Sequence, residues 1–283
     1  MLKMESVGFR YGRKGPDLFA GLDLVLEPGR IYGLLGSNGA GKTTLLKLAA
    51  ALLFPQGGRV TFDGLVVGSR RPQFLSDVFF IPETFALPAQ RPDQFVKITA
   101  PFYPKFQPET LRTALHEFEL EGNGALNRLS HGQQKKFLLA FGLACHCRLN
   151  LLDEPTNGLD IPSKSQFRRL LARQLDEDRI FVLSTHQTRE LEGLIDPIIM
   201  VQTGRVVLHH DRWTIDQRLV QGTSRTEPGP DVIYAEKAWD SWVTLAARKE
   251  TDPTPGSIDL ELLFNAVLNN PDAVQKALEV SHV

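Results

Sequence analysis

The residues Gly36 to Thr43, which read Gly-Ser-Asn-Gly-Ala-Gly-Lys-Thr, are the feature that most constrains the fold. They fit the G-x-x-x-x-G-K-[ST] pattern of a phosphate-binding loop and lie between the apolar run Ile31 to Leu35 and the helical spacing of Leu45, Leu46 and Leu48. Glycines let such a loop curl, so that backbone N–H groups converge on phosphate oxygens at the positive end of the next helix. The sequence therefore predicts a strand, a phosphate-binding loop and a helix. A glycine-rich turn that only begins a helix is the alternative interpretation.

This loop supplies the first set of candidate binding residues. We expect Lys42 to bridge the β- and γ-phosphates and act in catalysis, Thr43 to offer its hydroxyl to Mg²⁺, and Thr44 to add a phosphate contact. The full set expected to bind the nucleotide here comprises Gly36, Ser37, Asn38, Gly39, Ala40, Gly41, Lys42, Thr43 and Thr44.

A second set of candidates follows the apolar run Leu149 to Leu152, which ends in Asp153 and Glu154. In this class of fold a carboxylate at the C-terminal end of a strand beside the phosphate loop holds Mg²⁺. We expect Asp153 to bind the metal through water and Glu154 to polarise the water that attacks the γ-phosphate. The alternative is that Asp-Glu-Pro simply ends a strand.

The arrangement of apolar runs predicts an α/β fold with a largely parallel sheet. The expected strands, besides one at the N-terminus, are Ile31 to Leu35, Val60 to Phe62, Val78 to Ile81, Leu149 to Leu152, Ile180 to Leu183 and Ile198 to Val201. Between Ile81 and Leu149 a stretch interrupted by prolines gives way to the helical spacing of Leu111, Leu115 and Phe118. We interpret it as a helical subdomain, about residues 84–145, inserted between two strands.

The character of the sequence changes near residue 212. All three tryptophans follow, and Pro228 to Pro230 and Pro253 to Ser257 are predicted linkers. Ser257 precedes a helical apolar pattern that is expected to end near Pro271. We therefore divide the chain into one domain over 1–211 and a C-terminal appendage over 212–283.

Composition narrows the classes of partner and location. The formal net charge of −1 gives no electrostatic reason to expect nucleic acid. Cys145 and Cys147 are too few for a disulfide framework, so a reducing, cytoplasmic setting fits best, and we expect these two thiols to pack rather than bind metal. The N-terminus does not have the pattern of a secretory leader, and the apolar runs are too short to cross a bilayer.

Together these motifs resemble the nucleotide-binding subunit of an ATP-binding cassette (ABC) transporter over roughly residues 2–210. Leu129-Ser130-His131-Gly132-Gln133 matches the LSGGQ signature of that family at four of five positions, before Asp153 in the order the family uses. The resemblance implies a P-loop NTPase of ABC type, an α/β protein with a mixed sheet core, an N-terminal antiparallel β subdomain and an inserted helical subdomain.

The resemblance also implies that two copies sandwich ATP, each phosphate loop facing the other copy's signature. Ser130, Gly132 and Gln133 then contact the partner's nucleotide, and Ser130 can cap the helix that follows. In the same family pattern Tyr11 stacks on adenine and Asp160 communicates with the opposite site. His186 is the switch histidine at the γ-phosphate and is counted as catalytic.

Two positions depart from the family pattern. Glu83 stands where the family usually has glutamine, and we expect it on the metal side of the site. His131 replaces the first signature glycine. It is expected either to face solvent or to approach the partner's γ-phosphate.

The function implied by the resemblance is an ATPase that uses ATP and Mg²⁺. It would work as a homodimer or heterodimer and power a separate integral-membrane permease, expected to be an exporter, from the inner face of the cell membrane. Two alternatives stay open. One is a soluble ABC ATPase acting on the ribosome or DNA, and the other is an ATP-gated regulatory module.

Overall fold

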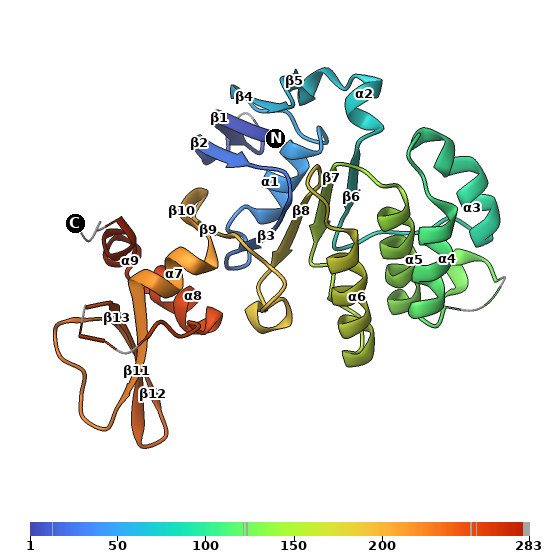
Figure 1. Cartoon of the computed structure of the whole chain (residues 1–283). Helices are drawn as coiled ribbons and strands as arrows, with labels where there is room; N and C mark the ends of the chain where they lie inside the picture. Colours follow the sequence, from blue (N-terminus) through green and yellow to red (C-terminus); the bar gives the residue numbers. More distant parts are fainter. Residues whose placement is uncertain (13, 121, 123, 250, 253, 280–283) are drawn as a thin grey trace.

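A computed structural model of the chain describes residues 1–12, 14–120, 122, 124–249, 251–252 and 254–279. At its centre lies a six-stranded sheet with the order β10-β9-β3-β8-β7-β6 (Figure 1). Its strands are β3 (Arg30–Leu35), β6 (Val78–Ile81), β7 (Leu149–Asp153), β8 (Ile180–Thr185), β9 (Ile198–Gln202) and β10 (Arg205–His210). All neighbours pair in parallel except β9 and β10, so the sheet is mixed. Five of the predicted apolar runs lie within these strands.

The N-terminal part of the chain forms a separate antiparallel sheet with the order β2-β1-β4-β5. Its strands are β1 (Leu2–Arg10), β2 (Asp17–Leu26), β4 (Gly57–Phe62) and β5 (Leu65–Val66). The run Val60 to Phe62 is therefore a strand of this sheet and not of the core. A 3₁₀ turn over Val67–Ser69 and helix α2 (Pro72–Leu75) lead back to β6.

Alternation along the core strands explains why both faces of the sheet are covered. In β3, Tyr32 and Leu34 pack into an apolar core shared with α1 (Lys42–Ala49) and the antiparallel sheet. Ile31 and Leu35 face the opposite way, into a core that includes side chains of the helices on the other face. Both faces of β3 are therefore covered by packed side chains up to the point where the loop to α1 begins.

Helices α3 (Pro92–Thr99), α4 (Pro108–Glu117) and α5 (His131–Ala144) lie beyond the β6 edge of the sheet (Figure 1). Short 3₁₀ turns over Ala100–Phe102 and Leu126–Arg128 connect them. Pro92 and Pro108 are the first residues of their helices, where proline is tolerated because the first N–H groups have no partner within the helix. Helix α6 (Ile161–Gln174) follows β7.

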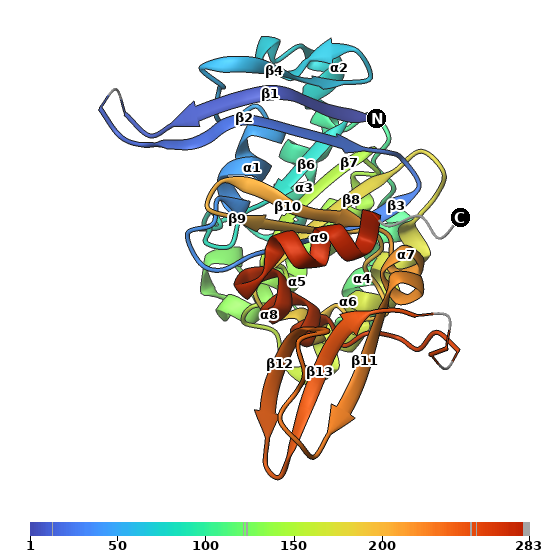
Figure 2. The same cartoon turned by 90° about the vertical axis from the view of Figure 1, so that its left-hand side faces the viewer.

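The C-terminal part consists of α7 (Arg212–Arg218), an antiparallel sheet with the order β11-β13-β12, and two helices. The elements are β11 (Leu219–Ser224), β12 (Val232–Ala238), β13 (Ser241–Ala247), α8 (Leu260–Asn269) and α9 (Pro271–Glu279). Figure 2 shows the three strands extending away from the core sheet, with α9 beside β10. Leu262 and Leu263 of α8 belong to the same apolar core as Ile198 and Met200 of β9, so this part packs on the core sheet.

One sequence prediction for this part was wrong, and another was confirmed, because the predicted helix is α8 and ends at Asn269 as expected. Pro228 to Pro230 do not link separate units, because they lie in the connection between two strands of one sheet, β11 and β12. Helix α8 begins after Asp259 rather than Ser257, since the Asp259 carboxylate accepts hydrogen bonds from the N–H groups of Glu261 and Leu262 at 2.7 and 3.2 Å. Of the second predicted linker, Pro253 lies outside the described residues.

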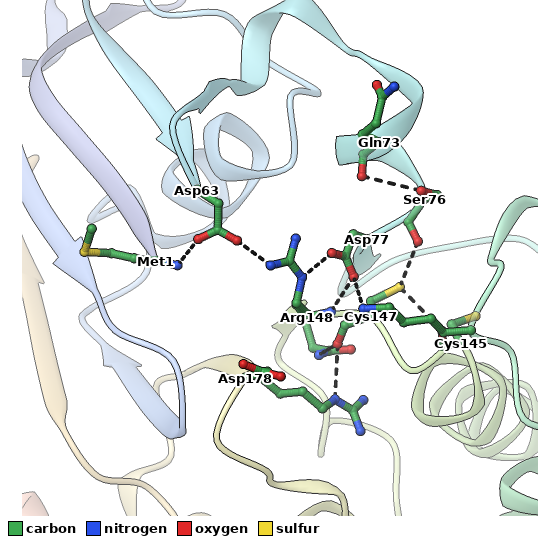
Figure 3. Close-up of polar contacts among 12 residues, drawn as sticks. Met1, Asp63, Gln73, Ser76, Asp77, Cys145, Cys147, Arg148 and Asp178 are labelled. Carbon is green, nitrogen blue, oxygen red and sulfur yellow. Dashed lines mark hydrogen bonds and ion pairs between the residues drawn. The ribbon is translucent and has the colours of Figure 1, made fainter.

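A polar cluster joins the antiparallel sheet to the core sheet (Figure 3). Asp63, just after β4, accepts a hydrogen bond from Nη1 of Arg148 at 2.5 Å. The carboxylate of Asp77 accepts from the Arg148 backbone N–H at 2.9 Å and from its Nε. The guanidinium also lies over the ring of Phe62, 5.3 Å from its centroid. Arg148 therefore ties β4, β6 and β7 together.

Candidate functional site

A cleft of about 450 Å³ opens where the loop after β3 meets the ends of β6 and β7. Its lining residues come from the antiparallel sheet, the loop, α1 and the two strand ends, and they are Tyr11, Leu18, Asn38, Gly39, Gly41, Lys42, Thr43, Thr44, Glu83, Asp153 and Glu154. Ten of these eleven residues, all except Leu18, were predicted from the sequence to bind nucleotide or metal or to act in catalysis. The topology thus brings residues from positions 11 to 154 into one cavity.

The loop places Lys42 in the lining of the cleft. Gly41 has a φ of 111°, which only glycine adopts without strain, and this turn starts α1 at Lys42. The Lys42 ammonium donates hydrogen bonds to the carbonyl oxygens of Gly36 and Ser37 at 2.6 and 3.2 Å. Burial lowers the pKa of Lys42, and the carboxylates of Glu154 and Asp153 oppose that shift. Gly36, Ser37 and Ala40 shape the loop but do not line the cleft.

Thr43 and Asp153 form the part of the site suited to a divalent cation. The Thr43 hydroxyl donates to Oδ2 of Asp153 at 2.7 Å, and the hydroxyl of Ser184 donates to Oδ1 at 2.5 Å. Asp153 is buried at the end of β7, and Ser184 lies beside it on β8. Hydroxyl and carboxylate oxygens are the ligands that Mg²⁺ uses, so the residues present fit this ion.

The side chains of Glu154 and His186 contact each other just beyond the C-terminal ends of β7 and β8. Glu154 has a φ of 46°, a left-handed conformation that turns its side chain out of the strand direction and costs about 1–3 kcal/mol. Its Oε1 lies 2.8 Å from Nδ1 of His186. Its Oε2 is buried and has no hydrogen-bond partner among the described residues, so it can accept a proton from a water molecule in the cleft.

Glu83 and Tyr11 also line the cleft. Glu83 follows β6 and its Oε1 accepts a hydrogen bond from the side-chain amide of Asn157 at 3.3 Å. The Tyr11 hydroxyl lies 2.9 Å from that of Thr44, and its ring packs edge-on against Phe9 with 57% of the residue exposed. An exposed ring face beside the loop is available to a planar base, and stacking on adenine stays a prediction.

The signature residues lie outside the lining of this cleft. Ser130 caps α5: its hydroxyl accepts from the N–H of Gln133 at 3.3 Å, and Gln133 Oε1 accepts from the N–H of Ser130 at 3.0 Å. A Cβ on Gly132 would approach the carbonyl of Gly158 to 2.8 Å, which explains glycine at this position. The structure therefore does not bring the signature to the cleft of its own chain.

Asp160 caps α6 by accepting a hydrogen bond from the N–H of Ser163 at 2.8 Å, and this contact lowers the pKa of Asp160. Asp160 also lies outside the cleft lining, as does His186, which reaches the site through Glu154. Both cysteines are buried, as expected for thiols that pack, and burial raises the pKa of Cys147 to about 12.

Sequence reasoning missed three residues that support the site. Ser184 holds Asp153, Asn157 holds Glu83, and Lys135 of α5 donates to the backbone carbonyls of Glu83 and Glu154. Ser184 could have been noticed as a polar residue at the end of an apolar strand. Nothing in the sequence distinguishes Lys135 from the exposed lysine that a helix normally carries.

Comparison with known proteins gives the same picture. A family model described as "ABC transporter" matches residues 19–157. "ABC transporter ATP-binding protein YtrB" of Bacillus subtilis (strain 168) is 27% identical over 247 residues, which cover 84% of this chain and 78% of YtrB. "SkfA peptide export ATP-binding protein SkfE" of the same organism is 32% identical over 192 residues, covering 66% of this chain and 80% of SkfE.

Among solved structures, "Dimeric structure of a post-hydrolysis state of the ATP-binding cassette MJ0796 bound to ADP and Pi" superposes with a TM-score of 0.66 at 24% identity. The match covers 75% of this chain and 98% of that one. A likeness at this identity supports the fold.

The fold and the cleft define a P-loop ATPase of the cassette type. With the family match and a relative 32% identical over most of its own length, the chain belongs to the family of ABC transporter ATP-binding proteins. The α/β fold with a mixed core sheet and an antiparallel β subdomain, and ATP as the ligand, are thereby confirmed. Among the residues that the structure describes, no helix combines the length and apolar character needed to cross a bilayer.

Proposed function

We propose that this chain is the ATP-hydrolysing subunit of an exporter-type transporter and drives a separate integral-membrane permease from the cytoplasmic face of the membrane. Export is favoured because the name of SkfE, 32% identical, describes peptide export. We further propose that residues 1–211 form the ATPase domain, with the helical part at about 84–145 passing motion to the permease, and that 212–283 form an appendage.

In the proposed nucleotide complex, the loop and Lys42 hold the phosphates, and Tyr11 stacks on the base. Thr43 and Asp153 hold Mg²⁺, with Glu83 on the same side. The ion, when bound, neutralises charge on the β- and γ-phosphate oxygens. The contact of Thr43 with Asp153 at 2.7 Å supports this assignment, because it places two hard oxygen ligands together beside Lys42.

The hydrolytic step rests on the pair of Glu154 and His186. Glu154 Oε2 accepts a hydrogen bond from the attacking water and takes its proton as the water oxygen bonds to the γ-phosphorus, while the bond from that phosphorus to the bridging oxygen breaks and ADP leaves. His186, held at 2.8 Å from Oε1, keeps the carboxylate oriented and reaches the γ-phosphate from the strand end of β8. The buried Oε2, which has no other hydrogen-bond partner in the described part of the chain, is the observation that carries this proposal.

The complete site needs a second copy of the chain. Ser130, Gly132 and Gln133 lie outside the cleft of their own chain, at the capped N-terminus of α5. That helix end presents N–H groups and partial positive charge suited to a γ-phosphate. We propose that it meets the nucleotide of a partner chain, with Asp160 at the same interface. Loss of the γ-phosphate then loosens the dimer.

The test of this function is Glu154→Gln. Removing a positioned base should lower kcat for ATP by about 10²- to 10⁴-fold while ATP binding persists. Ordinary turnover in the variant would reject Glu154 as the base. For the permease, the experiment is purification of the chain from membranes, followed by identification of the integral-membrane protein that accompanies it. Recovery only with ribosomes or DNA would contradict the transport proposal.

A further inference from the structure

Lys135 is a charged residue in an unusual place. It lies in α5, within two turns of the Ser130 cap, and is 0% exposed. Lysine is almost never fully buried unless its ammonium is paired, because removing that charge from water is costly. A fold that retains a lysine here must use its ammonium for something that an apolar side chain does not provide.

The contacts of the ammonium point to the site. Its Nζ donates to the backbone carbonyl of Glu83 at 3.3 Å and to that of Glu154 at 3.4 Å. It also lies over the ring of Phe85, 5.3 Å from the centroid. All three partners belong to the two segments that carry the acidic residues of the cleft.

These segments lie side by side because β6 and β7 pair in parallel, with Ile81 opposite Leu152. Glu83 and Glu154 each stand two residues beyond that pair, where the ladder has ended. The β6–β7 ladder therefore no longer joins these two segments, although the N–H of Glu154, which has the strained φ of 46°, still donates to the Ser184 carbonyl of β8 at 3.2 Å. Lys135 supplies a common donor to both carbonyls just where the sheet stops.

Side chains near the start of α5 contact the segment that carries Glu83 and Phe85. His131, the residue that replaces the first signature glycine, stacks on Phe85 with ring centroids 5.3 Å apart and an interplanar angle of 24°. His131 and Lys135 are four residues apart, so they lie on one face of the helix. Phe85 thus contacts both of them, and a shift of the signature helix moves the segment that carries Glu83.

We propose that Lys135 is a positioning residue for ATP hydrolysis: it links the signature helix to the turns that bear Glu83 and Glu154, so that docking of the helix end on a partner's nucleotide aligns both carboxylates for turnover. This inference rests on the proposed function of Glu154. Lys135 is buried, does not line the cleft, and acts through the backbone of the two glutamates.

The experiment compares Lys135→Met with Lys136→Met in the full-length chain. Lys136 is the matched control, since it is the next residue of the same helix and its Nζ donates to the carbonyl of Phe118 at 3.3 Å, away from the cleft. For Lys135→Met we expect kcat for ATP to fall by about 10- to 100-fold, the usual cost of losing a group that orients a catalytic ligand. KM should stay within about threefold, because the phosphate loop is unchanged.

Three results would overturn the inference: kcat of Lys135→Met within about twofold of the wild type, a rise in KM that accounts for the loss, or an equal loss in Lys136→Met. Thermal unfolding followed by circular dichroism establishes that each variant is folded. If the Met variant does not fold, Lys135→Gln, which can still donate to one carbonyl, is judged by the same criteria. Absence of ATP hydrolysis by the wild type contradicts the proposed function itself, whereas a fully active Lys135→Met contradicts only the role of Lys135.

Discussion

Replacing Asp77 with alanine tests how the antiparallel sheet is attached to the core sheet. The Asp77 side chain is only 10% exposed and accepts hydrogen bonds from both the backbone and the Nε of Arg148 (Figure 3). The variant leaves the guanidinium of Arg148 with its remaining ion pair to Asp63 and its contact with the Phe62 ring.

The expected loss follows from these contacts. Removing one partner of a buried ion pair costs about 3–5 kcal/mol, because the other charge is left uncompensated. Arg148 is 36% exposed and keeps Asp63, so we expect the lower end, about 3 kcal/mol, for Asp77→Ala. Asp63 is 35% exposed, and an ion pair this open to solvent is worth about 1 kcal/mol or less. Asp63→Ala is therefore the matched control.

The assay is urea unfolding followed by far-ultraviolet circular dichroism. Tryptophan fluorescence is unsuited to it, because Trp213, Trp239 and Trp242 all lie in the C-terminal part and report on that part alone. The free energy of unfolding is obtained from the midpoint and slope of each transition. A loss below about 1 kcal/mol for Asp77→Ala, or equal losses for the two variants, would refute the reasoning from burial.

Three further predictions concern acid stability, the C-terminal helices and the metal side of the site. Burial lowers the pKa of both His209 and His210 below the ordinary value of 6.5, so on acidification through that value the unfolded chain binds more protons than the folded one and stability is lost. Thermal unfolding should show that Tm falls between about pH 7.5 and 5.5, and that it falls less in the double variant His209→Gln/His210→Gln than in the wild type. An identical fall in both proteins would show that these histidines do not cause the loss of stability. Leu263→Ala, at a fully buried position of α8, should lower the free energy of urea unfolding by about 2–5 kcal/mol, and a loss under about 1 kcal/mol would contradict a shared core. Glu83→Gln should retain ATP binding but change the Mg²⁺ dependence of turnover, so superimposable Mg²⁺ titrations would remove Glu83 from the metal side.

The parts of the site that sequence could predict are those where chemistry fixes the spacing of neighbouring residues. Lys42 and Thr43 follow the loop because phosphate binding at a helix start requires that order, and Asp153 stands at a strand end for the same reason. Glu154 and His186 are 32 residues apart in sequence, and their contact depends instead on the pairing of β7 with β8. Such a contact can be expected only from a family resemblance.

Other features left no sequence signal because tertiary packing decides them. Lys135 is buried by the strand ends it supports, although a helical lysine ordinarily faces water. The strands β11, β12 and β13 are mostly half-buried, so their side chains do not alternate cleanly between apolar and polar. Pro228 to Pro230, in the connection between β11 and β12, therefore resemble a linker when only the sequence is considered.

We propose that ATP is held between two copies of this chain, by the loop of one and the α5 end of the other. Sedimentation of Glu154→Gln with ATP and Mg²⁺ tests it most directly. We predict a dimer of about twice the 31.6 kDa chain mass, and a monomer that still binds ATP once Ser130→Arg is added. ATP-bound Glu154→Gln that remains monomeric, or a dimer unaffected by Ser130→Arg, would contradict the account.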